Sequence, residues 1–317
     1  MVKPKVSLTL NGKEVFYSGE TVRGSLVIQL SEVIKAKSVF VLLVGKAHWR
    51  DPTQNDLAVS KKNLKFFLVR KITLVSPQSQ QRESTIVLNS GEHTYPFVFK
   101  LPSKVPSSFY VYHKDGYFSD GVSYAIKANI DVDKKFYEVT KKYWKKFYVH
   151  EVSNLSLIPD SLKYSEITAE KDVRSFFGVN YGAVYVKLSV PRRGYYLGDS
   201  IEATIEIDHA FFRNHTKNVA LELLRDTLIF ESKKIRRQRL TIEKRLLQDA
   251  IQTGLSYTFS EVISVPENIV PELFVEDFLR VEYSLALTVT PAMARDIVCR
   301  LPLNIVKYAE IEMRKLK

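Results

Sequence analysis

The chain has 317 residues, of which 45% are hydrophobic and 26% are charged, and it contains a single cysteine. A length above about 250–300 residues favours two domains over one core, and a lone cysteine excludes an intramolecular disulfide. The chain lacks the apolar run of a secretion signal or of a membrane span of roughly 20 residues, so we expect a soluble, cytoplasmic protein.

The net charge of +12 belongs almost entirely to the first half of the chain. Residues 1–157 carry 24 Lys and Arg against 13 Asp and Glu, a net charge of +11. Residues 158–317 carry 23 against 22, a net charge of +1. This asymmetry points to anionic partners, such as phosphate groups, an anionic membrane face or nucleic acid, without choosing among them.

In the first half, alternation of apolar and polar residues predicts a series of strands. Val6–Leu10 alternates and runs into Asn11-Gly12, a strong hairpin signal. Val39–Val44 is apolar on both faces, which is typical of a central strand, and Leu64–Val75 alternates again after a polar loop. Further strands are expected at 91–102, 122–132 and 143–152.

After the last of these strands, residues 154–175 are polar and lack a clear period, so we place a linker at 158–175. The second half then repeats the strand pattern at 183–190, 200–208, 219–230, 257–265, 281–289 and 297–306. Leu240–Ile251 is ambiguous, because its apolar spacing fits a helix or a pair of strands.

An internal repeat organises the whole chain. Val15–Ile28 and Gly194–Ile207 share an aromatic run, a Gly-acid turn and an alternating strand, with Gly19-Glu20 aligned to Gly198-Asp199. Two later signals recur in the same order, including the strands around Tyr124 and Tyr283. Such repetition indicates two domains of one architecture. We therefore predict an all-β protein with two tandem immunoglobulin-like antiparallel β-sandwich domains at 1–157 and 176–308, followed by a short tail at 309–317.

The ordered motifs of both halves resemble those of the arrestin-domain-containing (α-arrestin) family. The resemblance is carried by Ser18-Gly19-Glu20-x-Val22-x-Gly24, Gly45-x-Ala47-x-Trp49, Gly91-Glu92-His93-x-Tyr95-Pro96-Phe97, Pro106-Ser107-Ser108-Phe109, Gly121-Val122-x-Tyr124, Val190-Pro191-Arg192-Arg193-Gly194-Tyr195-x-x-Gly198-Asp199 and Val281-x-Tyr283-x-Leu285. It implies an arrestin fold and a non-enzymatic adaptor that binds cytoplasmic tails of membrane proteins.

Members of that family also recruit WW-domain ubiquitin ligases through PPxY motifs. This chain contains no Pro-Pro pair, so ligase recruitment through that motif is not encoded in it. The resemblance implies action in trafficking, endocytosis, signal transduction or ubiquitin-linked sorting, peripherally at the plasma membrane or endosomes. An alternative is a retromer-type structural trafficking subunit, which would hold its partners permanently.

The candidate anion-binding residues are lysines of the basic first half. A run in which lysines alternate with aromatic residues could bind phosphate groups of a protein tail or of anionic phospholipids, or it could be an edge strand whose lysines prevent sheet-to-sheet association. Lysines near the polar loop after Trp49 could add to the same surface. The candidates are Lys61, Lys62, Lys65, Lys141, Lys142, Lys145 and Lys146.

Other motifs give no indication of catalysis, metal binding or nucleic-acid binding. The basic stretch Lys233–Arg239 has acids nearby and is interpreted as a locally paired surface rather than a nuclear signal. The six histidines lack metal-ligand spacing, Cys299 fits a core strand, and no nucleophile elbow or phosphate loop is present. No RNA- or DNA-binding pattern is present either. We expect no metal, no cofactor, no catalysis and no nucleic-acid partner.

Overall fold

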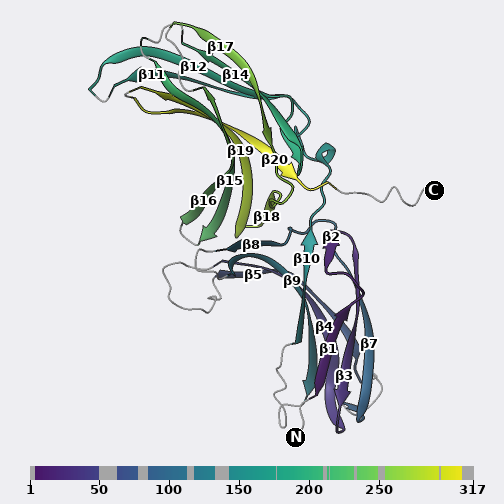
Figure 1. Cartoon of the computed structure of the whole chain (residues 1–317). Helices are drawn as coiled ribbons and strands as arrows, with labels where there is room; N and C mark the ends of the chain where they lie inside the picture. The colour runs from purple at the N-terminus through teal and green to yellow at the C-terminus, as the bar shows by residue number, and fades with distance from the viewer. Residues whose placement is uncertain are drawn as a thin grey trace, which may run out of the picture. The chain divides into compact units, whose positions relative to one another are not determined.

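The computed structural model describes residues 4–49, 63–77, 85–112, 118–132, 143–175, 177–209, 213, 215–231, 234–248, 254–292 and 294–308. The chain divides into two compact units, Met1–Glu151 and Val152–Lys317 (Figure 1). In the described residues each unit is made of strands in two sheets, and the helical structure there is limited to 3-10 turns, at Asn63 and in η2 (Leu155–Leu157). The predicted all-β tandem of sandwiches is therefore confirmed.

The first unit contains a three-stranded sheet, β1-β3-β7, and a seven-stranded sheet with the main order β2-β10-β9-β4-β5. In the larger sheet, β6 pairs with β4 and β8 pairs with β9. The strands are β1 (Lys5–Leu10), β2 (Val15–Tyr17), β3 (Thr21–Leu30), β4 (Ile34–His48), β5 (Leu64–Val75), β6 (Ile86–Leu88), β7 (Gly91–Lys100), β8 (Phe109–Tyr112), β9 (Phe118–Val132) and β10 (Tyr143–His150).

The second unit contains a four-stranded sheet, β11-β12-β14-β17, and a six-stranded sheet with the main order β13-β20-β19-β15-β16, in which β18 pairs with β19. The strands are β11 (Ser165–Arg174), β12 (Asn180–Val190), β13 (Gly194–Tyr196), β14 (Ser200–Asp208), β15 (Thr216–Glu231), β16 (Lys234–Gln248), β17 (Ser256–Ser264), β18 (Leu273–Val275), β19 (Leu279–Pro291) and β20 (Ile297–Val306).

Period-two burial builds the core of each unit. In β3, Val22, Leu26 and Ile28 are fully buried, while Arg23, Ser25 and Val27 on the other face are more exposed. The predicted central strand at Val39–Val44 lies in β4, between β9 and β5. Because both edges of β4 are paired, its outward side chains form the middle of a sheet surface.

The internal repeat is visible in the hydrogen bonds. In the first unit, Gly19 has a φ of 80°, and the Glu20 carboxylate accepts a 2.8 Å bond from Tyr17 N. In the second, Gly198 has a φ of 92°, and the Asp199 carboxylate accepts a 3.0 Å bond from Tyr196 N. Each turn follows a short strand that pairs in parallel with the last strand of its unit, β2 with β10 and β13 with β20. The two halves thus share one architecture.

Three local expectations differ from the structure. Asn11-Gly12 forms a turn, but β1 pairs with β3 and β2 pairs with β10, so this turn moves the chain between sheets and does not close a hairpin. The expected linker at 158–175 contains β11, which pairs antiparallel with β12. The helical alternative for the Leu240 segment is wrong over its described part, because residues 240–248 belong to β16.

Candidate functional site

The outward side of the seven-stranded sheet carries a row of lysines and aromatic rings. Along β10 the side chains alternate, so Phe147 and Val149 are buried in the core while Trp144 and Lys146 point outward. Lys146 is level with Ala125 of β9, which is level with Val44 of β4. Strand register therefore brings residues distant in the sequence into one row across the sheet.

Neighbouring rows add further cations and apolar groups. Lys46 of β4 is level with Ser123 of β9 on one side and with Phe66 of β5 on the other. Val69 of β5 is level with Val44. Phe66 and Val69 are 49% and 57% exposed, although both are apolar. They form an accessible apolar strip on the edge strand, next to the lysines.

Cation–π contacts hold the lysines close together. The Lys127 ammonium lies 3.7 Å from the centre of the Trp144 ring and 6.0 Å from the centre of the Phe66 ring. The Lys46 ammonium is 5.9 Å from the Trp144 ring centre. Such contacts keep a cation at an aromatic surface without neutralising its charge. Trp144, which is 37% exposed, therefore gathers two ammonium groups around one accessible ring.

Lys71 of β5 belongs to the same side, because it is level with Leu42 of β4, which is level with Lys127 of β9. We call these outward side chains the basic–aromatic face; its members are Lys46, Lys71, Lys127, Lys146, Phe66, Val69 and Trp144. A hollow of about 210 Å³ opens in it, with Ser123, Ala125 and Val44 among its lining residues. Lys46, Lys146 and Trp144 also line the hollow. The size suits a small anionic group with its immediate neighbours.

The electrostatics of the hollow favour an anion. Burial lowers the pKa of the Lys46 ammonium, and the positive charge of Lys146 lowers it further. The sequences of β4, β5 and β10 contain no Asp or Glu, and β9 contains only Asp120 and Asp131. An anion placed between Lys46 and Lys146 would relieve their mutual repulsion and accept hydrogen bonds from both ammonium groups.

The predicted anion-binding lysines do not all lie on this face. Lys146 does. Lys145 points to the other side of β10 and forms a 2.6 Å ion pair with Glu14, which lowers the pKa of that carboxyl. Lys65 is level with the buried Ala47, so it too points away from the face. Lys61, Lys62, Lys141 and Lys142 lie outside the described residues.

Sequence reasoning missed Lys46 and Lys127, because each stands alone among apolar residues in its own strand. The signal that unites them is the register between β4, β5, β9 and β10, which a single sequence does not contain. Alternation alone separates Lys145 from Lys146, because neighbours in a strand point to opposite faces.

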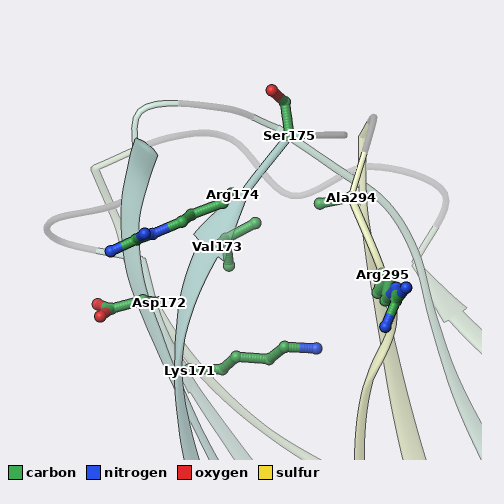
Figure 2. A pocket seen from close by; sticks show the side chains of 7 residues that line it. All are labelled: Lys171, Asp172, Val173, Arg174, Ser175, Ala294 and Arg295. Carbon is green, nitrogen blue, oxygen red and sulfur yellow. The ribbon is translucent and has the colours of Figure 1, made fainter. Parts of the chain in front are cut away.

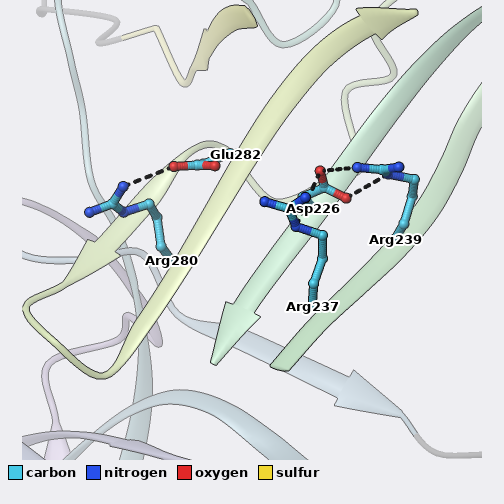
Figure 3. A network of polar contacts seen from close by, with 5 residues as sticks. All are labelled: Asp226, Arg237, Arg239, Arg280 and Glu282. Carbon is cyan, nitrogen blue, oxygen red and sulfur yellow. Dashed lines mark hydrogen bonds and ion pairs between the residues drawn. The ribbon is translucent and has the colours of Figure 1, made fainter. Parts of the chain in front are cut away.

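The basic stretch of the second unit is locally paired, as predicted. Asp226 of β15 accepts hydrogen bonds of 2.8 and 2.7 Å from Arg239 of β16, with Arg237 at 4.0 Å on the same carboxylate (Figure 3). On the neighbouring strand, Arg280 pairs with Glu282 at 3.0 Å. Further pairs join Glu231 with Lys234 and Arg236, Glu222 with Lys244, and Glu243 with Arg245. These arginines are committed to neighbouring carboxylates.

A second hollow lies in the second unit, between β11 and the segment that precedes β20. It has a volume of about 350 Å³, and Figure 2 shows Lys171 reaching across it toward Arg295 while Arg174 and Asp172 point away. The Lys171 ammonium donates a 3.1 Å hydrogen bond to the Asp296 carbonyl oxygen. Two cations from separate elements thus face one hollow, which could accept a small anion.

Three further features bear on function. Within the described ranges, no group of three or more His, Cys, Asp and Glu side chains is placed to hold a metal ion. In that same part of the chain, no helix is long and apolar enough to cross a bilayer. Cys299 is 2% exposed on β20, as expected for a core residue, and burial raises the pKa of its thiol.

Comparisons with known proteins agree with this architecture. Residues 5–155 match the family model described as "Arrestin (or S-antigen), N-terminal domain", and residues 180–309 match "Arrestin (or S-antigen), C-terminal domain". Arrestin domain-containing protein B of Dictyostelium discoideum is 26% identical over 93% of this chain, which spans 44% of that protein's length.

Two human proteins are also similar. Thioredoxin-interacting protein is 25% identical over 92% of this chain and 71% of its own length. Arrestin domain-containing protein 4 is 25% identical over 92% of this chain and 68% of its own length. With both family models matched in order along a tandem of β-sandwiches, the chain belongs to the arrestin-domain-containing (α-arrestin) family.

Proposed function

We propose that the protein is a non-enzymatic adaptor whose basic–aromatic face binds acidic or phosphorylated segments in the cytoplasmic tails of membrane proteins. The observation that carries the proposal is the hollow between Lys46 and Lys146, beside the cation-gathering ring of Trp144. Arrestin-family proteins typically bind membrane-protein partners, and the charge of the first unit suits anionic ones. Action in endocytosis or sorting, at the plasma membrane or endosomes, is part of the same proposal.

The physical basis is charge-assisted hydrogen bonding at a partly desolvated surface. An ammonium group contributes more to anion binding when aromatic rings and neighbouring strands displace water from around it. Lys46 is in that state, because burial already disfavours its charge. A bound carboxylate or phosphate would favour the charged form and raise the pKa of the Lys46 ammonium again, so binding and protonation of Lys46 should reinforce each other.

The test is a titration of the whole chain with fluorescein-labelled tail peptides, each in an unphosphorylated and a phosphorylated form. The variant is Lys46→Gln/Lys127→Gln/Lys146→Gln. Its control is Lys5→Gln/Lys35→Gln/Lys37→Gln, which removes the same charge from exposed positions of the same unit. We expect the first variant to weaken binding at least about tenfold, and more at low salt, because each ammonium contributes a charge-assisted bond.

Two results would contradict the proposal. One is an affinity that responds to neither salt nor the triple substitution. The other is an equal loss in the control variant, which would mean that the net charge acts and the face does not. Anionic vesicles in place of peptides separate a membrane partner from a protein partner, and co-purification of a stoichiometric subunit would favour the retromer-type alternative.

A further inference from the structure

The arrangement of the basic–aromatic face constrains the sequence of its ligand. We propose that it selects short segments in the polyproline II conformation that carry an anionic side chain and an apolar side chain three positions apart. This inference rests on the proposed function, because it specifies the peptide class that binds at the same face. It uses the position of the hollow, the position of the apolar strip and the strand spacing between them.

The anion position is centred on β9. The lining residues Ser123 and Ala125 belong to β9, while Lys146 and Lys46 flank it on β10 and β4. The apolar position is on β5, where Phe66 and Val69 are about half exposed. β4 is the single strand between β9 and β5. Two inter-strand steps therefore separate the two positions, a distance of about 10 Å.

The ligand backbone has to cross the strands without pairing to them. β9 is bonded to β10 and β4, and β4 is bonded to β9 and β5, so their main-chain groups are already used. A segment on this surface gains no ladder hydrogen bonds, which removes the advantage of an added strand. Polyproline II suits such a surface, because it has no internal hydrogen bonds and keeps its backbone solvated.

The spacing then follows from the two geometries. Polyproline II has three residues per turn and rises about 3.1 Å per residue, so side chains at i and i+3 share a face and lie about 9 Å apart. That matches the separation of about 10 Å between the anion position and the apolar strip. In an extended strand, by contrast, side chains at i and i+3 point to opposite faces. The sheet thus favours i and i+3 over i+2 or i+4.

Lys127 lies within reach of both halves of the ligand. Its ammonium is close to Trp144, beside the anion position, and also close to Phe66 in the apolar strip. Phe66 and Val69 are side chains of a sheet strand and do not form a loop tip, so they are poorly placed to insert into a bilayer. A peptide with mixed anionic and apolar character fits this surface better than a membrane does.

The experiment compares proline-rich peptides of identical composition that differ only in spacing. Each contains one phosphoserine, two prolines, one alanine and one leucine, with the leucine two, three or four positions after the phosphoserine. A reversed set places the leucine first, and a parallel set replaces phosphoserine with glutamate. Affinities for the whole chain are measured by fluorescence anisotropy. We expect the three-position spacing to bind about tenfold tighter than the others, in one of the two directions.

Matched variants assign the preference to named residues. Val69→Ser should abolish the spacing preference while leaving affinity for the acidic group, whereas Val98→Ser, at a similarly exposed valine of β7, should change neither. Lys146→Gln should weaken all peptides, and Lys37→Gln should not. Circular dichroism checks that each variant is folded.

The outcomes separate the two proposals. If every acidic peptide binds alike regardless of spacing, and Lys146→Gln weakens them all, the spacing rule is overturned and the proposed function stands. If no acidic peptide binds, or Lys146→Gln has no effect, the proposed function is overturned along with the rule. Tighter binding of anionic vesicles or of single-stranded oligonucleotides than of any peptide would likewise overturn both.

Discussion

Gly24→Ala tests whether the glycine of the first repeat is required by packing. Gly24 lies in β3, the middle strand of the three-stranded sheet. A Cβ at this position would lie 2.3 Å from Thr9 O and 2.5 Å from Cζ of Phe97. Thr9 O belongs to the backbone of β1, and Phe97 is 3% exposed, so neither atom can move away without disturbing the sheet or the core.

The expected loss of folding stability follows from overpacking of a well-packed site. Inserting a methyl group where the neighbours cannot yield costs about 1–3 kcal/mol, and a backbone contact places this substitution at the upper end. Gly12→Ala is the control, because Gly12 has open space around the added methyl and a φ of +66°, which costs a non-glycine residue only about 1–2 kcal/mol. Gly24→Ala should therefore destabilise the first unit more than Gly12→Ala does.

The assay is urea unfolding followed by tryptophan fluorescence. Both tryptophans of the chain, Trp49 and Trp144, belong to the first unit, so the signal reports that unit alone. A loss of about 3 kcal/mol should lower the urea midpoint by roughly 1–2 M. A midpoint for Gly24→Ala equal to or above that of Gly12→Ala would refute the packing argument.

Three predictions concern the second unit. Burial raises the pKa of Glu272 to about 7 from 4.5, so the folded state holds its proton more tightly than the unfolded state does; the stabilisation present at low pH is lost as the pH rises from about 4.5 to 7. Glu272→Gln keeps an acceptor for Asn304 and should raise stability at pH 8 by about 1–3 kcal/mol while changing it little at pH 4.5, measured by urea midpoints; an equal change at both pH values would contradict this. Cys299 should react with a thiol reagent only after unfolding, and rapid labelling of the folded chain would show that the thiol is accessible. Asp226→Asn should lower the folding stability by about 1 kcal/mol, because it weakens the hydrogen bonds from Arg239. The loss, measured as a fall in the thermal midpoint, should be smaller at 1 M NaCl, and a loss independent of salt would point to packing instead.

The fold was predictable from the sequence because its signals are local and repeated. The Gly-acid turns recur in the sequence, and the structure gives both the same hydrogen-bond pattern, from Tyr17 N to Glu20 and from Tyr196 N to Asp199. A turn that needs a positive φ and a carboxylate that caps it are specified by adjacent residues. Alternation then predicts strands wherever one side is buried.

The errors came from features that depend on distant partners. Asn11-Gly12 specifies a turn but not which strands pair, and here β1 finds its partner in β3. The strand β11 was missed because it lies at a sheet edge and buries only Val173, so its apolar pattern is weak. In both places the pairing with a distant strand determines the local structure, and the local sequence does not specify that pairing.

The candidate site was only partly predictable for the same reason. Lys146 was identified from a run of lysines and aromatic residues, but its partners on the face, Lys46 and Lys127, come from other strands. Lys145, adjacent in the sequence, is instead paired with Glu14 on the opposite side. Composition located the charge in the first half, and strand register determines which lysines meet.

The most direct test of the account is to locate a bound acidic tail on the protein. A phosphorylated peptide with a photo-crosslinking group next to its phosphoserine is bound to the whole chain, irradiated, and mapped by mass spectrometry. We predict cross-links to the outward residues of β4, β9 and β10 around Lys46 and Trp144, and their loss in the triple lysine variant. Cross-links confined to the second unit, or unchanged in that variant, would contradict the claim that this face binds the partner.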